Sequence, residues 1–336
     1  IEGGLKPVIF LVGSAGVGKS ALARYILSYM SNSDGYSGGV LDMQLQGGIG
    51  LQLKVLANVL KKRGYKSDFC FSSDLQVSEN QRLELLFDHC CSHKTILIVD
   101  NLEKQLYPSG NIGDWSMKTL IERFLSQNMN GSVLLLLSRV PLNCNYNANP
   151  LCFTHELKGW DIDFVYEKYL PYLQHLNTRL SNIASENKRK QLLKSMEGNP
   201  LALNIANYLC TFNKLEVIVN CIKDKHNPAQ NLIRLVSEEL KNEEIEALNR
   251  FAQFNRPMSK NEIIEYVCSE SVLKSLQIRQ LIESIADSDN QYGMHPLIVA
   301  QFDLQNDIEK RKEIVSDISS KILHDLKQVN IEEVYN

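Results

Sequence analysis

The sequence predicts an α/β fold in which a parallel sheet, covered by helices, occupies residues 1–155 and an all-helical region follows. Three observations support this prediction. Apolar runs and helix-spaced segments alternate over the first 140 residues, as in repeated βα units. The apolar runs are continuous, which is typical of parallel strands buried on both faces. Strand patterns become rare after about residue 160, so a second domain is expected there.

The first predicted strand, Val8–Val12, leads directly into the sequence GSAGVGKS at residues 13–20. This segment matches G-x-x-x-x-G-K-[ST], and a helical pattern follows it. A strand, a glycine loop and a helix in this order place backbone N–H groups and a helix N-terminus around an anion. The sequence therefore predicts a P-loop that binds a nucleoside triphosphate or diphosphate. The expected phosphate-binding residues are Gly13, Ser14, Ala15, Gly16, Val17, Gly18, Lys19, Ser20 and Ala21.

Further βα units are expected up to about residue 140. The predicted strands are Gly39–Leu45, Thr95–Val99 and Ser132–Leu137, and the helices between them are Leu51–Leu60, Gln81–Cys90 and Leu120–Leu125. Ligands of parallel sheets lie beyond the carboxyl ends of the strands. Gly13, Asp100 and Arg139 all fall there, so they are expected to share one site.

Each polar residue at these strand ends has a candidate role. Lys19 is expected to reach the β- and γ-phosphates, and the Ser20 hydroxyl and Asp100 to hold Mg²⁺. Glu103 is a candidate for orienting an attacking water, and Arg139 for sensing the γ-phosphate with its planar guanidinium. The structural alternatives stay open: a plain carboxylate at a strand end, a solvated loop glutamate and a surface arginine.

The composition limits the function classes. At 336 residues the chain is long enough for two to four domains. Its 44% hydrophobic and 22% charged residues describe a globular protein, and a net charge of -3 gives no general reason for binding nucleic acid or anionic membranes. No apolar stretch approaches the length of a membrane span. The eight scattered cysteines suit a reducing compartment, so a cytoplasmic location is expected.

The second half divides into three predicted parts: helices over 156–226, a unit of short helices over 227–305, and an amphipathic helix within 306–336. The apolar stripe predicted for the last helix consists of Ile308, Val315, Ile318, Ile322 and Leu326. Such a stripe either docks on its own domain or connects to a further region, and the pattern leaves both open.

Five motifs occur in a fixed order: GSAGVGKS, ILIVDN, LLLLSR, EGNPLAL at residues 197–203 and YGMHPLI at residues 292–298. This order resembles the STAND class of signalling ATPases, most nearly the NB-ARC type of apoptosome proteins, plant immune receptors and bacterial regulators. The resemblance implies that 156–226 is a helical domain with a G-x-P motif and that 227–305 is a winged-helix domain.

The resemblance also implies roles for two later residues. Pro200 matches the proline that packs against the adenine ring. His295 matches the histidine that contacts the β-phosphate of ADP and fastens the winged-helix domain onto the nucleotide. Two positions depart from the plant pattern: Pro296 stands in place of an aspartate, and Asn101 stands in place of a second acidic residue. The second departure leaves Glu103 as the candidate catalytic carboxylate and implies slow hydrolysis.

The implied function is a nucleotide-dependent signalling switch, with a role in innate immunity or defence as one expectation. ADP would hold a closed state, and exchange for ATP would open the chain and allow self-association. Effector and sensor domains are expected outside this sequence. A motor-type ATPase with continuous turnover is one alternative. A transcription regulator is another, but residues 227–302 hold seven Lys/Arg against eleven Asp/Glu, a poor balance for binding DNA.

Overall fold

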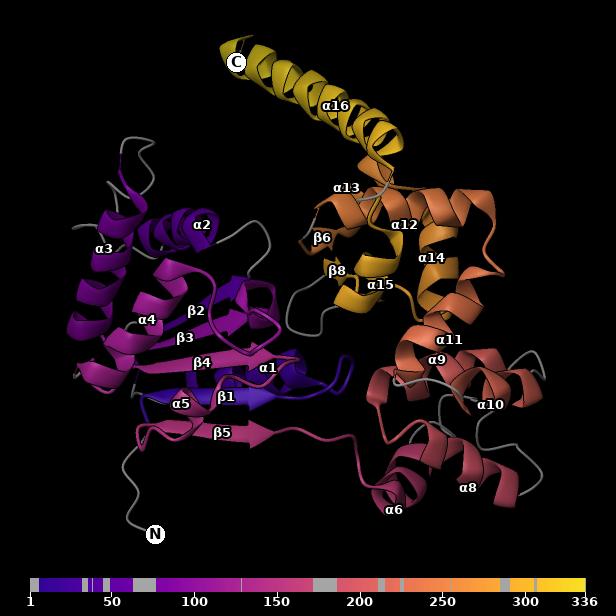
Figure 1. The fold of residues 1–336 in the computed structure, drawn as a ribbon. Coiled ribbons are helices and arrows are strands. Elements are labelled where there is room, and N and C mark those ends of the chain that lie inside the picture. The colour runs from indigo at the N-terminus through magenta and orange to yellow at the C-terminus, as the bar shows by residue number, and fades with distance from the viewer. Residues whose placement is uncertain are drawn as a thin grey trace. The chain divides into compact units, whose positions relative to one another are not determined.

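A computed structural model of the chain describes residues 6–31, 36–37, 39–44, 49–62, 77–127, 129–171, 186–210, 215–223, 227–254, 256–284, 291–304 and 307–335. The chain forms two compact units, Ile1–Lys158 and Gly159–Asn336. Figure 1 shows a sheet with helices in the first unit and mainly helices in the second. The first unit ends close to the boundary predicted at residue 155, and the finer domain limits stay predictions.

The first unit contains a five-stranded parallel sheet with the strand order β2-β3-β4-β1-β5. Its strands are β1 (Val8–Val12), β2 (Gly39–Gln44), β3 (Thr95–Asp100), β4 (Val133–Ser138) and β5 (Cys152–Glu156). The four strands predicted from the sequence are confirmed; the end of the second prediction, Leu45, lies outside the described residues. The fifth strand was not predicted, because an edge strand with four exposed residues carries no continuous apolar run.

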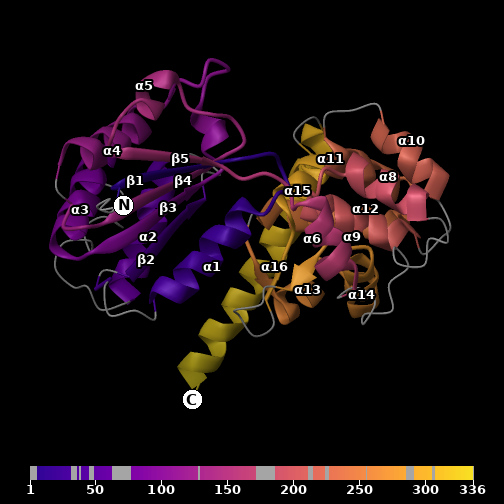
Figure 2. The same ribbon diagram turned by 90° about the horizontal axis from the view of Figure 1, so that it is seen from below.

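Helices cover the two faces of this sheet unequally. The larger core lies under α2 (Ile49–Lys62), α3 (Glu79–Ser92) and α4 (Trp115–Ser126), whereas α1 (Lys19–Ser31) covers the opposite face. Figure 2 shows α1 and α4 on opposite sides of the strands. Alternate strand residues serve the two cores, so that Leu134 and Leu136 face one and Leu135 and Leu137 the other. A short helix, α5 (Cys144–Asn147), precedes the edge strand.

The second unit begins with helices and continues with a winged-helix arrangement. Its first elements are α6 (Ile162–Phe164), η3 (Val165–Tyr169), α8 (Glu186–Ser195), α9 (Pro200–Leu209), α10 (Leu215–Lys223) and α11 (Pro228–Ser237). The winged-helix elements are α12 (Asn242–Phe254), β6 (Met258–Ser259), α13 (Lys260–Tyr266), α14 (Glu270–Ile278), β7 (Glu283–Ser284), β8 (Gln291–Gly293) and α15 (Pro296–Phe302). The three short strands form one antiparallel sheet in the order β6-β8-β7. The α/β fold class, with helical and winged-helix parts after the sheet, is therefore confirmed.

A buried ion pair joins the helices of the second unit. Glu244 of α12 is 2% exposed, and its Oε1 accepts hydrogen bonds from Ser275 at 2.6 Å and from Arg279 Nε at 3.0 Å. Arg279 also donates to the hydroxyl of Tyr208 in α9 at 2.7 Å. The backbone N–H of Lys241 donates to Glu244 Oε2 at 2.8 Å. The contacts connect α9 with the winged-helix elements α12 and α14.

The last helix, α16 (Ile308–Tyr335), packs against α12. Ile314 and Ile318 are its buried residues in the core, whereas Ile308 is 61% exposed and Val315 is 42% exposed. The predicted stripe was therefore wrong at Ile308 and Val315, because the contact face is rotated around the helix; the side chain of Leu326 lies outside the described residues. None of the helices in the described ranges is long and apolar enough to cross a membrane.

Candidate nucleotide site

The glycine loop connects β1 to α1 and is held at its first residue. The N–H of Gly13 donates to the carbonyl oxygen of Ser138, at the end of β4, at 3.2 Å. A Cβ at residue 13 would overlap the carbonyl oxygen of Leu157, so this close backbone approach requires glycine. Gly16 and Gly18 have φ angles of 80° and 102°, a region that favours glycine. The motif residues are thus needed for the shape of the loop.

The side chain of Lys19 folds back onto this loop and contacts its backbone. Its Nζ donates to the carbonyl oxygens of Gly13 at 2.8 Å and Ser14 at 3.0 Å, and the residue is 9% exposed. Burial lowers the pKa of Lys19, and the charges of Glu103 and Asp100 partly oppose that shift. The ammonium is therefore held by neutral acceptors near two carboxylates. A phosphate group would offer it a stronger, charge-assisted contact than a backbone carbonyl does.

Ser20 and Asp100 lie in direct contact across the site. The Ser20 hydroxyl donates to Asp100 Oδ2 at 2.6 Å, and the N–H of Asn101 donates to Asp100 Oδ1 at 2.8 Å. Asp100 is the last residue of β3, and Asn101 turns the chain with a φ of 61°. A hydroxyl and a carboxylate are oxygen ligands of the kind that Mg²⁺ prefers. These two side chains therefore fit the predicted metal role.

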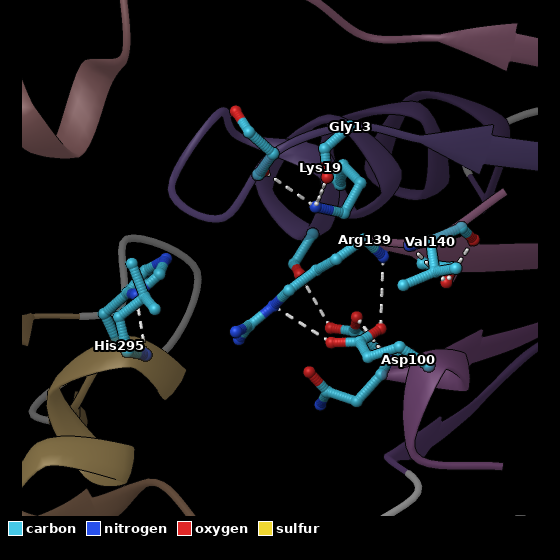
Figure 3. Close-up of polar contacts among 12 residues, drawn as sticks. Gly13, Lys19, Asp100, Arg139, Val140 and His295 are labelled. Atoms are coloured by element: carbon cyan, nitrogen blue, oxygen red, sulfur yellow. Dashed lines mark hydrogen bonds and ion pairs between the residues drawn. The ribbon is translucent and has the colours of Figure 1, made fainter. Parts of the chain in front are cut away.

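Glu103 and Arg139 form a second pair at the same edge of the sheet. Arg139 Nε lies 2.9 Å from Glu103 Oε1, and the backbone N–H of Arg139 donates to Glu103 Oε2 at 3.2 Å. Figure 3 shows Arg139 near Lys19 and Asp100. Both residues are predicted from the sequence but their pairing is not, since nothing in the local pattern indicates which loop residues meet.

Pro200 and His295 belong to the second unit, so their relation to the glycine loop stays a prediction. Pro200 is the first residue of α9, and the Asn199 side chain caps that helix by accepting from the N–H of Ala202 at 3.1 Å. His295 caps α15 in a similar way, because its Nδ1 accepts from the N–H of Leu297 at 3.1 Å. Figure 3 shows this contact. Both residues therefore have a structural role whether or not they contact a nucleotide.

The glycine of the G-x-P motif has a packing role that sequence analysis missed. The N–H of Trp160 donates to the carbonyl oxygen of Gly198 at 2.8 Å. Gly198 has a φ of 64°, and a Cβ there would overlap the carbonyl oxygen of Trp160. Two distant segments thus meet backbone to backbone, and only glycine fits at this position. Gly159 is a sign of this contact in the sequence, because a Cβ at that residue would overlap the carbonyl oxygen of Glu197, which precedes Gly198.

Comparisons with known proteins support the fold. No family model matches the chain, and no curated protein matches it. Among solved structures, it is similar to a Signal Transduction ATPase with Numerous Domains (STAND) protein with a tetratricopeptide repeat sensor from Pyrococcus horikoshii, with a TM-score of 0.60 and 16% identity. The match covers 95% of this chain and 43% of that one, so the chain spans less than half of its neighbour's length.

A second solved structure, the ORC2 protein of Aeropyrum pernix in its ADPNP–ADP complexes, gives a TM-score of 0.38 and 14% identity, covering 95% of this chain and 90% of that one. The likeness to the STAND protein concerns the fold, and it agrees with the architecture above: the chain has the fold of a P-loop NTPase with helical and winged-helix parts.

Proposed function

We propose that this chain is a nucleotide-dependent signalling switch of the NB-ARC type, which binds ADP at rest and exchanges it for ATP. The observation that carries the proposal is that four polar side chains lie at the same edge of the sheet as the glycine loop. Lys19 and Ser20 follow that loop and begin α1, whereas Asp100 is the last residue of β3 and Arg139 directly follows β4. Ligands of open parallel sheets bind at this edge.

Each of these residues binds a different part of the nucleotide. Backbone N–H groups of the loop other than that of Gly13, which donates to Ser138, face the phosphates, and Lys19 exchanges the carbonyls of Gly13 and Ser14 for phosphate oxygens. Ser20 and Asp100 hold Mg²⁺, which neutralises phosphate charge when bound. Arg139 recognises the γ-phosphate. In the second unit, Pro200 packs against the adenine and His295 contacts the β-phosphate of ADP.

The switch requires that ADP and ATP favour different arrangements of the chain. We propose that ADP stabilises a closed state and that ATP releases His295 and allows self-association. Hydrolysis is slow, because Asn101 stands where a second acidic residue would add a catalytic carboxylate. Sensor and effector domains outside this sequence supply the trigger and the output, and defence is the role that the resemblance suggests.

The direct test is nucleotide retention. The purified protein is denatured and the released nucleotide is identified by chromatography, for the wild type and for Lys19→Ala. We expect bound ADP in the wild type and none in the variant, because Lys19 is the cation inside the loop. Lys118→Ala, which removes an exposed lysine paired with Glu122 in α4, is the control and should retain ADP. Equal retention by all three proteins would contradict the phosphate assignment.

A further inference from the structure

Glu103 has two functions open to it in the proposed site: it can orient a water, or it can hold Arg139. The observed contacts concern the second. Both carboxylate oxygens are engaged by the same residue, Oε1 by the guanidinium Nε at 2.9 Å and Oε2 by the backbone N–H at 3.2 Å. One glutamate therefore fixes the direction of the arginine side chain relative to its own backbone.

The backbone of both partners is held in place by buried or hydrogen-bonded neighbouring residues. Glu103 lies in a short helical turn, η2 (Leu102–Gln105), whose first residue, Leu102, is fully buried in the larger core. Arg139 lies between Ser138 and Val140. The Ser138 hydroxyl donates to the carbonyl oxygen of Val140 at 2.8 Å and accepts from its N–H at 3.1 Å. The ion pair thus connects two fixed loops at the carboxyl ends of neighbouring strands.

The pairing leaves the outer part of the guanidinium available. In the described part of the chain, no hydrogen bond or ion pair involves Nη1 or Nη2 of Arg139. Its side chain is 32% exposed, against 17% for that of Glu103. Figure 3 shows the extended side chain of Arg139, which ends in these two nitrogens. A guanidinium held through Nε still presents two N–H donors in one plane, which suits a phosphate group.

We infer that Glu103 is a positioning residue that holds Arg139 ready to bind the γ-phosphate, and that it thereby sets the preference of the site for ATP over ADP. The inference rests on the proposed function and deepens it. Glu103 is also the first of the charges that oppose the lowering of the Lys19 pKa, so its carboxylate supports both cations of the site. Glu103 therefore contributes to recognition of the third phosphate through its contact with Arg139.

The test is the affinity of ADP and of a non-hydrolysable ATP analogue, each with Mg²⁺, measured by calorimetry. Glu103→Gln keeps the size of the side chain but replaces one acceptor with a donor, so one of the two contacts with Arg139 is lost. We expect the affinity for the ATP analogue to fall about tenfold, the effect of one charge-assisted hydrogen bond, while the affinity for ADP stays unchanged. Arg139→Ala should show the same loss, and the double variant should lose no more.

Two further variants make the test specific. Glu103→Asp keeps the charge but is one methylene too short to reach both donors. It should therefore also lower the affinity for the ATP analogue. Glu84→Gln removes a surface carboxylate paired with Arg123 at 2.7 Å in the same unit and should bind both nucleotides like the wild type. It controls for the loss of one negative charge.

The outcomes separate the inference from the function it rests on. If the wild type binds nucleotide and Lys19→Ala does not, the phosphate site stands. Unchanged affinities in Glu103→Gln together with lost hydrolysis would then overturn the inference and assign Glu103 to the attacking water. Additive losses in the double variant would overturn it too. A wild type that binds neither nucleotide would remove the site and both proposals with it.

Discussion

At the scale of single residues, His295 combines a structural contact with a proposed ligand contact. Its Nδ1 accepts from the N–H of Leu297 and caps α15, so the proposed phosphate contact is assigned to the other ring nitrogen, Nε2. Pro296 follows at the first helical position, where its missing N–H costs nothing. A substitution of His295 by alanine therefore removes two contacts at once, and its effect alone would not separate them.

Asparagine separates the two roles of His295. His295→Asn supplies a side-chain oxygen that caps helices well, yet it has no group in place of Nε2. We expect both His295→Ala and His295→Asn to release ADP several-fold faster than the wild type, measured with a fluorescent ADP in a stopped-flow instrument. If only the alanine variant releases ADP faster, the histidine acts through the helix cap and the phosphate contact is excluded.

At the scale of helices and strands, Glu244 is a buried carboxylate that connects helices of the second unit. Burial raises its pKa, but hydrogen bonds from Ser275 and Lys241 and the charge of Arg279 outweigh burial, so the pKa lies below the ordinary value of 4.5. A carboxyl with a lowered pKa contributes stability at neutral pH that is lost as the pH falls below 4.5. The same contacts join α9 to α12 and α14, so they couple the G-x-P helix to the winged helix.

Glu244→Gln should destabilise these helices by about 3 kcal/mol, because it leaves Arg279 without its buried carboxylate. Hydrogen–deuterium exchange of peptides from α12 and α14 measures this loss as faster exchange. Glu246→Gln, which removes an exposed partner of Arg250, should change the free energy of opening obtained from exchange by less than about 1 kcal/mol. The difference in exchange between the wild type and Glu244→Gln should become smaller below pH 4.5, because the carboxyl of Glu244 is then increasingly protonated in the unfolded chain and its stabilising contribution falls. Equal exchange at pH 7 would show that the ion pair contributes nothing.

At the scale of the whole molecule, the boundary between the two units falls between Lys158 and Gly159. The last residues of the first unit are tied to the glycine loop, since the N–H of Leu157 donates to the carbonyl oxygen of Val12 at 2.7 Å and its own carbonyl lies against Gly13. Trp160, three positions further on, pairs with Gly198 of the G-x-P motif. The residues on either side of the boundary are thus each hydrogen-bonded within their own unit.

Self-association is the property of the whole molecule that the proposed switch predicts. We expect a monomer with ADP and a larger assembly with a non-hydrolysable ATP analogue, measured by light scattering after gel filtration. Arg139→Ala should stay monomeric with the ATP analogue and still bind ADP, because its contact is with the third phosphate. A wild type with one mass under both conditions would exclude ATP-driven assembly.

The sequence by itself determined the glycine loop, four of the strands and the order of the elements, because each depends on local periodicity or on a motif that is contiguous in the chain. Tertiary structure decided which side chains meet. The pairing of Glu103 with Arg139 and the buried contact of Glu244 with Arg279 join residues more than thirty positions apart, and no local pattern specifies such partners. The exposed edge strand β5 and the buried face of α16 were decided in the same way, since burial depends on what packs against an element.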